Sequence, residues 1–491
     1  MSGIRLSRHN AIATADAPDP GWRTLGCKGT DMADGQQGIF GASGHHRWFS
    51  FHRLAARGKR GQTLSGNTIS KSNRLPSKGS DPFYHGLLGC LVLLIVTSQA
   101  ASAGDWPQIL GVNRNGIAVG EKIADKFPAG GPAKVWQATI GSGFAGVAVA
   151  DKTLVLFHRL DNKDTLTAYD AETGKELWSQ GFETEFVPQI VPDDGPRAVP
   201  TVHKNRVYAL APNGGLYCVD LKSGKPLWQR QVQREFNAPA GYFGSGSSPL
   251  AEGKLLIVNV GGDKAGAGVV AFDLETGKTE WKSVNDQASY SSPVAVTESG
   301  TRHLLCLTRL NFVSLDPVTG KERFRTPFGQ RGPTVNAAIP VMMKNQVLLT
   351  ASYGIGAELL TIHPDKVDVT WSDEILASQY TTPIVHDGMI YGVDGRQDGG
   401  SVALKCFDPQ TRKVAWSQPA SAYATLISAD GKLLMMHTNG LLKIVDLDKK
   451  AYREIASAQL LGGTTRALPA LANGRLYLRN ENTLKCVSLD K

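Results

Sequence analysis

The sequence lacks the features that mark several common classes of protein. No apolar run is long enough to span a bilayer as a helix, because the longest candidate, Leu87–Val96, has only about ten residues. The histidines past residue 103 form no HxH or HxxxH pair, so neither a metal site nor a catalytic residue is predicted from them. They are His158, His203, His303, His363, His386 and His437.

The positive charge of the chain does not indicate a nucleic-acid partner. The formal net charge is +9, but residues 1–81 hold twelve Lys or Arg and five Asp or Glu, which accounts for +7. The remainder carries only +2, and no basic surface with interleaved aromatics follows from that balance. We therefore expect no nucleic-acid binding.

Residues 1–103 are predicted to be a leader. Residues 1–80 have no sustained apolar periodicity and are rich in Gly, Ser, Arg and His. Ala101–Ala103 follows the short apolar run with the small-x-small pattern of a cleavage site. We predict a signal peptide at about residues 83–103 and a mature chain that begins at Gly104. The mature protein would then have no transmembrane segment and would be exported to a periplasmic or extracellular location.

A thirteen-residue pattern returns along the rest of the chain. Its clearest copy is Leu166–Trp178, LTAYDAETGKELW, in which an aromatic residue follows an Asp by eight positions. Four further copies are clear and three are weaker, which makes eight units. The clear copies are Leu216–Trp228, Val269–Trp281, Phe312–Phe324 and Leu404–Trp416, and the weaker ones are Leu359–Trp371, Leu442–Glu454 and the unit that starts at Leu484.

Each unit is predicted to form the outer half of a four-stranded blade. Apolar β-formers precede the Asp, a glycine such as Gly174 supplies the positive φ of a turn, and a second strand ends at the aromatic. Another hairpin precedes each unit, as in Ala198–Ala211 with its turn at Lys204–Asn205. Successive Asp positions are 38 to 53 residues apart, a period typical of β-propeller blades.

The two ends of the chain predict how the ring closes. The eighth unit stops at Lys491, before a fourth strand could follow, whereas Lys134–Ile140 is an unpaired copy of that strand with Trp136 in the aromatic position. A ring in which the N-terminal strand completes the last blade leaves no open sheet edge. We therefore predict an all-β fold for residues 134–491. It is an eight-bladed β-propeller of four-stranded antiparallel blades, closed by an N-terminal strand.

Residues 104–133 precede the ring and are rich in Gly and Pro, with Trp106 and Ile109 as the obvious apolar anchors. We expect an extended N-terminal arm that lies on the ring and whose removal costs little stability. A short linker to a partner is the alternative. Among the four cysteines past residue 103, Cys218, Cys406 and Cys486 hold the same position in their units, and such positions in non-neighbouring blades cannot meet. These cysteines are predicted to be small buried residues.

The repeats resemble a known family. Asp170–Trp178, Asp220–Trp228 and Asp273–Trp281 follow the pattern DxxTGKxxW, with Ser223 for Thr in the second. They resemble the tryptophan-docking repeats of pyrroloquinoline quinone (PQQ) β-propellers, in which the Trp of one blade docks against its neighbour. Within that family the compact, secreted form is similar to BamB-like members. The resemblance implies structural, blade-docking roles for Trp136, Trp178, Trp228, Trp281, Phe324, Trp371 and Trp416.

The chain departs from the family pattern in three places. Phe324 replaces Trp in the fourth unit, Glu454 stands at the aromatic position of the seventh unit, and Arg412 stands where Gly is usual. We therefore expect the seventh blade to dock least tightly.

The resemblance implies two classes of function. BamB is an outer-membrane assembly propeller, whereas quinoprotein dehydrogenases typically hold PQQ and Ca²⁺ beside a disulfide between adjacent cysteines. The sequence contains no Cys–Cys pair. We therefore expect an exported, non-catalytic scaffold without a cofactor, a monomer that binds an envelope protein or a small ligand on one face. The alternative is a PQQ-dependent dehydrogenase that uses PQQ with calcium to oxidise an alcohol or a sugar.

One face of the ring offers candidate binding residues. A small or apolar residue and a proline precede most of the predicted innermost strands, as at Val199–Pro200. Because innermost strands line the channel of a propeller, the residues three before these prolines should ring one mouth. They include Arg197, Tyr290, Tyr380 and Arg466, with Tyr423 near the corresponding place. Tyr and Arg are enriched in binding hot spots. The alternative is that these residues only cap the channel.

Overall fold

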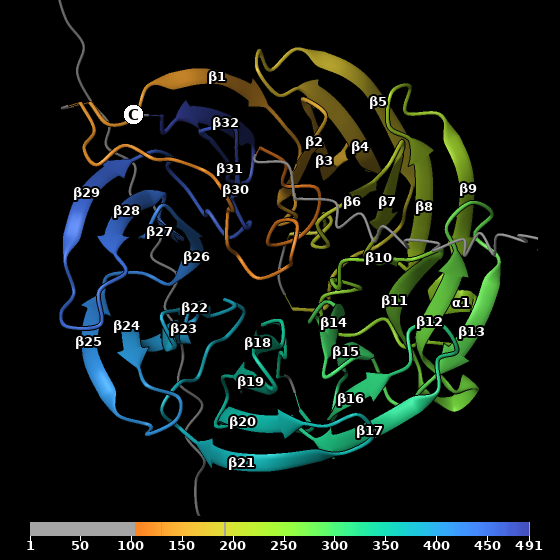
Figure 1. Cartoon of the computed structure of the whole chain (residues 1–491). Helices are drawn as coiled ribbons and strands as arrows, with labels where there is room; N and C mark the ends of the chain where they lie inside the picture. The colour runs from red at the N-terminus through yellow and green to blue at the C-terminus, as the bar shows by residue number, and fades with distance from the viewer. Residues whose placement is uncertain (1–103, 129, 191–192, 333, 491) are drawn as a thin grey trace, which may run out of the picture. The chain divides into compact units, whose positions relative to one another are not determined.

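The computed structural model describes residues 104–128, 130–190, 193–332 and 334–490, so the predicted leader and its signal peptide lie outside the described residues. The described chain forms eight four-stranded antiparallel sheets around a central axis, which confirms the predicted eight-bladed β-propeller (Figure 1). Within each blade the strands follow one another from the channel outward, and hairpins join them. The innermost strands are short, so their ends and the loops before them define the two mouths of the channel.

The first four blades lie in chain order around the ring (Figure 1). Blade 1 comprises β2 (Val147–Ala150), β3 (Thr153–Leu160), β4 (Lys163–Asp170) and β5 (Glu176–Glu183). Blade 2 comprises β6 (Thr201–His203), β7 (Arg206–Leu210), β8 (Gly215–Asp220) and β9 (Pro226–Gln231), followed by the one-turn helix α1 (Val232–Glu235). Blade 3 comprises β10 (Leu250–Glu252), β11 (Leu255–Gly262), the 3₁₀ turn η1 (Asp263–Ala265), β12 (Ala267–Asp273) and β13 (Thr279–Ser283). Blade 4 comprises β14 (Val294–Glu298), β15 (Thr301–Leu307), β16 (Asn311–Leu315) and β17 (Glu322–Pro327).

The last four blades complete the ring. Blade 5 comprises β18 (Val341–Met343), β19 (Gln346–Ala351), β20 (Gly356–Ile362) and β21 (Val367–Asp373). Blade 6 comprises β22 (Ile384–His386), β23 (Met389–Arg396), β24 (Gly399–Phe407) and β25 (Val414–Ala420). Blade 7 comprises β26 (Ala424–Ala429), β27 (Lys432–His437), β28 (Leu441–Asp446) and β29 (Glu454–Gln459). Blade 8 comprises β30 (Ala470–Ala472), β31 (Arg475–Arg479), β32 (Thr483–Ser488) and, from the other end of the chain, β1 (Lys134–Thr139).

Strand β1 closes the ring as predicted. It pairs antiparallel with β32, and Trp136 lies opposite Cys486 in the register (Figure 1). Every other blade takes its outermost strand from the hairpin that follows its third strand. The first strand of the ring therefore occupies the place that a continuation of the chain past β32 would fill.

The turn of each repeat explains why its sequence is so constant. In blade 1, Asp170 Oδ1 accepts hydrogen bonds from the Thr173 backbone N–H (2.8 Å) and the Thr173 hydroxyl (2.7 Å). Gly174 follows with φ +72°. A Cβ on this glycine would lie only 2.5 Å from the Trp136 ring. Glycine is thus required both by the backbone conformation and by the aromatic ring that packs on the turn.

The outer-strand aromatics lie against the next blade. Trp136 Nε1 donates to Ala171 O of blade 1 at 3.0 Å, and Trp178 Nε1 donates to Leu221 O of blade 2 at 2.8 Å. The same indole-to-carbonyl bond is made by Trp228, Trp281, Trp371 and Trp416. Phe324 has no N–H and instead packs within an apolar cluster that includes β19 and β20 of blade 5. The four cysteines past the leader are free and buried, in agreement with the sequence prediction.

The N-terminal arm is more compact than the extended segment that we expected. Residues 108–116 form consecutive turns and bends, and Trp106, Leu110 and Ile123 are buried. Trp106 pairs with Val149 of β2 through two 2.8 Å backbone hydrogen bonds, and Ala118 N donates to Ser428 O of β26. The arm therefore bonds to the innermost strands of blades 1 and 7. The sequence indicated Trp106 as an anchor, but its Gly/Pro-rich composition gave no signal that Leu110 and Ile123 would be buried as well.

The side chain of Arg114 extends from the arm into the channel. Its guanidinium donates to Pro293 O at 2.9 Å and also to Pro249 O, which joins the beginnings of β10 and β14. The side chain is 3% exposed, and burial lowers its pKa to about 9. Backbone carbonyls rather than a carboxylate hold this cation, so its position depends on the ring being assembled.

Candidate functional site

The six residues that stand three positions before the prolines all line one cavity of about 410 Å³. The cavity, called the mouth cavity below, lies at the ends of the loops that enter the innermost strands. Four of the six are the predicted Arg197, Tyr290, Tyr380 and Arg466, which come from blades 2, 4, 6 and 8; the other two are Gly246 and Ala337. These positions are far apart in the sequence, and they come together because each lies three residues before the proline that precedes an innermost strand.

The arm forms the floor of the mouth cavity. Ile109 lines it beside Val199 and Leu468, which precede the prolines of blades 2 and 8. Arg114 and its neighbours line a separate cavity of about 510 Å³ on the other side of the arm. Residues of the arm thus line both cavities.

Two arginines face the same aromatic ring in the mouth cavity. The guanidinium carbon of Arg466 lies 5.1 Å from the centroid of Phe144, and that of Arg197 lies 5.7 Å from it. Arg197 also lies 5.9 Å from the Phe243 ring. Within the described chain neither arginine forms an ion pair with a carboxylate. A cation held over an aromatic face without a counter-ion is suited to an anionic ligand.

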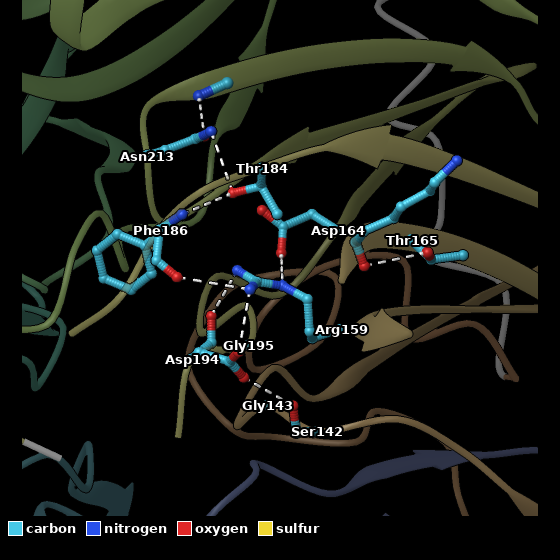
Figure 2. Close-up of polar contacts among 12 residues, drawn as sticks. Ser142, Gly143, Arg159, Asp164, Thr165, Thr184, Phe186, Asp194, Gly195 and Asn213 are labelled. Carbon is cyan, nitrogen blue, oxygen red and sulfur yellow. Dashed lines mark hydrogen bonds and ion pairs between the residues drawn. The ribbon is translucent and has the colours of Figure 1, made fainter. Parts of the chain in front are cut away.

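Arg159 fixes the loop that presents Arg197. It donates from Nε to Asp164 Oδ1 (2.9 Å) and from its terminal nitrogens to Asp194 Oδ2 (3.1 Å) and Asp194 O (2.7 Å) (Figure 2). Arg197 in turn donates to Gly195 O at 2.9 Å. Asp164 is fully buried; that burial raises the pKa of its carboxyl, and the Arg159 guanidinium opposes the increase. The buried ion pair therefore anchors the loop while the Arg197 head group reaches the cavity.

Gln397 connects the other two predicted residues. Its Oε1 accepts from Arg466 Nε at 2.6 Å and from the Tyr380 hydroxyl at 2.8 Å. Burial raises the pKa of Tyr380 well above its usual range, so the hydroxyl keeps its proton and remains a donor. Nearby, Asp398 is held by Arg396, and this contact lowers the pKa of that carboxyl. The polar side chains of this wall therefore hold one another in place in the absence of a ligand.

Tyr423 differs from the other predicted mouth residues. It is only 1% exposed and does not line the cavity. Its hydroxyl accepts hydrogen bonds from the backbone N–H groups of Tyr380 (3.1 Å) and Thr381 (3.2 Å), and its ring packs on Tyr380 at 4.6 Å. Tyr423 therefore supports the wall from behind.

Sequence reasoning missed two aromatic members of the cavity. Phe144 precedes the innermost strand of blade 1, where Gly146 stands in place of the proline found in six other blades. The offset from proline therefore could not identify Phe144. Phe243 lies in the loop before β10, and Tyr290 accepts a hydrogen bond from its backbone N–H at 3.1 Å. A comparison of all the loops before innermost strands, with or without proline, would have identified both.

The residues of the mouth cavity fit a quinone held by a divalent cation poorly. Its carboxylate, Asp398, is already bound by Arg396 and Gln379. Throughout the described residues, no group of three or more His, Cys, Asp or Glu side chains could hold a metal ion. The cavity offers guanidinium groups, hydroxyls and aromatic rings, which suit anionic and apolar groups of a ligand.

Comparisons with known proteins identify the family. The family described as "Outer membrane protein assembly factor BamB" matches residues 125–258 and 193–418. The solved structure of BamB from Moraxella catarrhalis superimposes with a TM-score of 0.52 at 14% identity and covers 72% of this chain and 97% of that one. Because the identity is so low, this likeness shows the fold alone.

Two classes of curated relative match the chain in part. The dehydrogenase subunit of an alcohol dehydrogenase (quinone) from Gluconacetobacter polyoxogenes is 31% identical over 148 residues, which is 28% of this chain and 19% of that protein. BamB from Burkholderia pseudomallei is 26% identical over 201 residues, which is 40% of this chain and 45% of that protein. The chain therefore matches less than half the length of either relative. None of the helices in the described residues is long and apolar enough to cross a membrane.

Proposed function

The chain belongs to the PQQ-repeat β-propeller family, and we propose that it is an exported, non-catalytic scaffold of the cell envelope. In this proposal the mouth cavity binds an acidic and apolar segment of an envelope protein. The leader pattern in residues 83–103 motivates the export. The relatives that carry the BamB description motivate the scaffold role.

One observation carries the proposal. Arg197 and Arg466 lie over Phe144 at the rim of an apolar cavity, and no carboxylate among the described residues pairs with them. A desolvated cation beside aromatic rings gains most from a partner that supplies a carboxylate together with apolar surface. Arginine and tyrosine are also the residues most often found as interface hot spots. An acidic side chain flanked by apolar residues has this chemistry.

A quinoprotein dehydrogenase is the second candidate, because the sequence relatives of this chain include dehydrogenase subunits. Under that alternative the same cavity would receive PQQ, whose acidic groups the two arginines would hold. The scaffold is preferred because Asp398, the one carboxylate that the described residues contribute to the lining, is already bound by its neighbours. Loading the purified protein with PQQ and Ca²⁺ and assaying dye-linked oxidation of alcohols and sugars separates the two. Sustained turnover would overturn the scaffold proposal.

The binding role is tested by removing the two charges. The double variant Arg197→Gln and Arg466→Gln should lose an envelope protein that the natural protein retains, with at least a tenfold fall in affinity for it, which is about 1.4 kcal/mol. Arg453→Gln, between β28 and β29 of blade 7, is the matched control because its guanidinium is exposed and pairs with Asp446. Tyr380 is left intact because it packs on the buried Tyr423. Equal retention of the partner by all three proteins would contradict the proposal, provided that their melting temperatures agree.

A further inference from the structure

A second and larger cavity lies beside the mouth cavity on the same face. Its volume is about 550 Å³, and Gly246 and Tyr290 line both cavities. Its walls are the loop that follows α1, the β11–β12 hairpin, the loop before β14 and the β15–β16 hairpin. The cavity thus belongs to blades 2 to 4 and is built by elements independent of the arm.

Carboxamides dominate the lining of this cavity, which is called the amide cavity below. The six are Gln189, Gln233, Asn259, Asn285, Gln287 and Asn311. Each carboxamide can both donate and accept hydrogen bonds without carrying charge. Tyr242 and Tyr290 add aromatic rings to the same walls. The mouth cavity, by contrast, offers cations and apolar rings, so the two cavities differ in the ligand that they suit.

The charged residues of the amide cavity balance in number and are partly engaged already. Asp286 Oδ2 accepts from the Thr308 hydroxyl (2.6 Å), Leu310 N (2.9 Å) and Asn311 Nδ2 (2.8 Å). Arg309 donates to the backbone carbonyls of Gly332 and Thr334, which lie in the loop between β17 and β18. These bonds order the loops around the cavity, and carboxamides such as Gln287 and Asn311 bond to protein groups as well. Asp263 and the exposed Arg331 complete the balance of two negative and two positive side chains in the lining. A neutral ligand therefore fits the cavity better than an ionic one.

Asn259 shows that the inner wall holds an unused acceptor. The residue is 2% exposed, and its Nδ2 donates to Leu307 O at 3.2 Å. Its Oδ1 has no partner among the described residues. An unpaired buried acceptor is unfavourable, and a ligand hydroxyl that reached it would relieve that cost. Gln233 is fixed in the same wall, because its Nε2 donates to Ser245 Oγ at 2.9 Å.

We propose that the amide cavity binds a neutral oligosaccharide. Sugar hydroxyls both donate and accept hydrogen bonds, so they match carboxamides that do the same. The apolar faces of sugar rings can pack on tyrosine rings. The volume lies in the range usual for small-molecule sites. This inference does not depend on the partner proposed for the mouth cavity.

Titration of the full-length protein with maltotriose, cellotriose and the trimer of N-acetylglucosamine tests the proposal by calorimetry. At least one of the three is expected to bind saturably. Gln287→Ala and Tyr242→Ala should each weaken that binding about tenfold, which is about 1.4 kcal/mol. Gln418→Ala is the matched control, because Gln418 is an exposed amide on β25 on another blade.

Two further measurements separate the outcomes. The affinity should not change between low and high salt, because a neutral ligand makes no screened charge contact. It should also be unchanged in the Arg197→Gln, Arg466→Gln double variant, so failure of the envelope-partner proposal would leave this one standing. The proposal is overturned if none of the three trisaccharides binds, or if both cavity variants bind as tightly as Gln418→Ala while retaining the natural melting temperature.

Discussion

Two neighbouring blade contacts differ in the residue that the outermost strand presents to the next blade. They are the contact between blades 8 and 1 and the contact between blades 7 and 8. At the first, Trp136 is 7% exposed, lies on the Gly174 turn of blade 1 and donates to Ala171 O at 3.0 Å. At the second, Glu454 occupies the aromatic position and forms an ion pair with Lys443 on its own blade at 2.9 Å. The seventh blade therefore has no indole to place on its neighbour.

The chain ends explain this difference. The outermost strand of blade 8 is β1, which no hairpin joins to β32, so the blade lacks the glycine turn on which an aromatic ring packs in the other blades. The arm takes that place: Ala124 N donates to Leu489 O at 2.8 Å, and Ser488 N donates to Ala133 O at 2.9 Å. Ile123 is fully buried in the apolar cluster that joins blades 7, 8 and 1. A docking aromatic at position 454 would have no turn to meet, and the arm supplies the buried apolar surface instead.

Deleting residues 104–133 should give the largest effect, contrary to what the sequence indicated. The deletion removes the buried Trp106, Leu110 and Ile123 together with the Arg114 bonds inside the channel. At about 2–5 kcal/mol for each large apolar side chain, the loss approaches the roughly 5–15 kcal/mol that stabilises a typical protein. The truncated protein should be largely unfolded at room temperature by circular dichroism. A melting temperature within a few degrees of the full protein would show that the arm is peripheral after all.

Trp136→Ala should have the next largest effect. Truncation of this aromatic at the contact between blades 8 and 1 should lower the free energy of unfolding by about 3–5 kcal/mol. Glu454→Ala is the matched change at the contact between blades 7 and 8, and it should cost less than about 1 kcal/mol because it breaks only a partly exposed ion pair. Denaturant titration of both variants measures the difference. Equal losses would mean that the indole adds nothing to blade docking.

The contact between blades 8 and 1 should also respond to pH through His158. Its Nδ1 accepts from Gly141 N at 2.8 Å, just after β1, and burial lowers the pKa of the imidazole to about 3, with a further contribution from Arg479. The unfolded chain binds a proton near pH 6.5 and the folded one does not, so stability falls as the pH drops below 6.5. The contribution is about 1.4 kcal/mol for each pH unit, or roughly 2 kcal/mol at pH 5.

Comparison of His158→Gln with the natural protein isolates this effect, because the other histidines are common to both. The stability of the variant should fall less steeply between pH 6.5 and pH 5 in denaturant titrations at each pH. Parallel pH profiles would contradict the assigned role. On blade 7, burial also lowers the pKa of His437, which lies near Lys443 and Glu454, and this contribution is the same in both proteins.

The fold could be predicted because its information is repeated and local. The Asp-to-aromatic spacing marks one turn and two strands in each unit, and the unpaired copy at Trp136 matches the strand that the last unit lacks. The arm could not be predicted in the same way. Its burial depends on Arg114 meeting the carbonyls of Pro249 and Pro293, which come together only when the ring is assembled.

The candidate site was predicted in part for the same reason. Four side chains share one offset from a proline, so Arg197 and Arg466 reach one cavity even though hundreds of residues separate them in the sequence. The prediction was wrong for Tyr423, because β26 begins at Ala424 and the tyrosine directly precedes the strand. The amide cavity is assembled from four separate loops with no shared offset, and no repeat marks it.

The pairing of β1 with β32 also governs when the molecule can finish folding. β1 is the first described strand of the ring and β32 is the last, so the closing contact has nearly the greatest sequence separation that the ring allows. Contacts of this kind form slowly because a long loop must close first. A ribosome that stalls or stops before β32 leaves seven blades with an exposed edge and an unpaired first strand. Such chains present unpaired strand edges that favour aggregation. Only a chain that has closed its ring lacks such an edge.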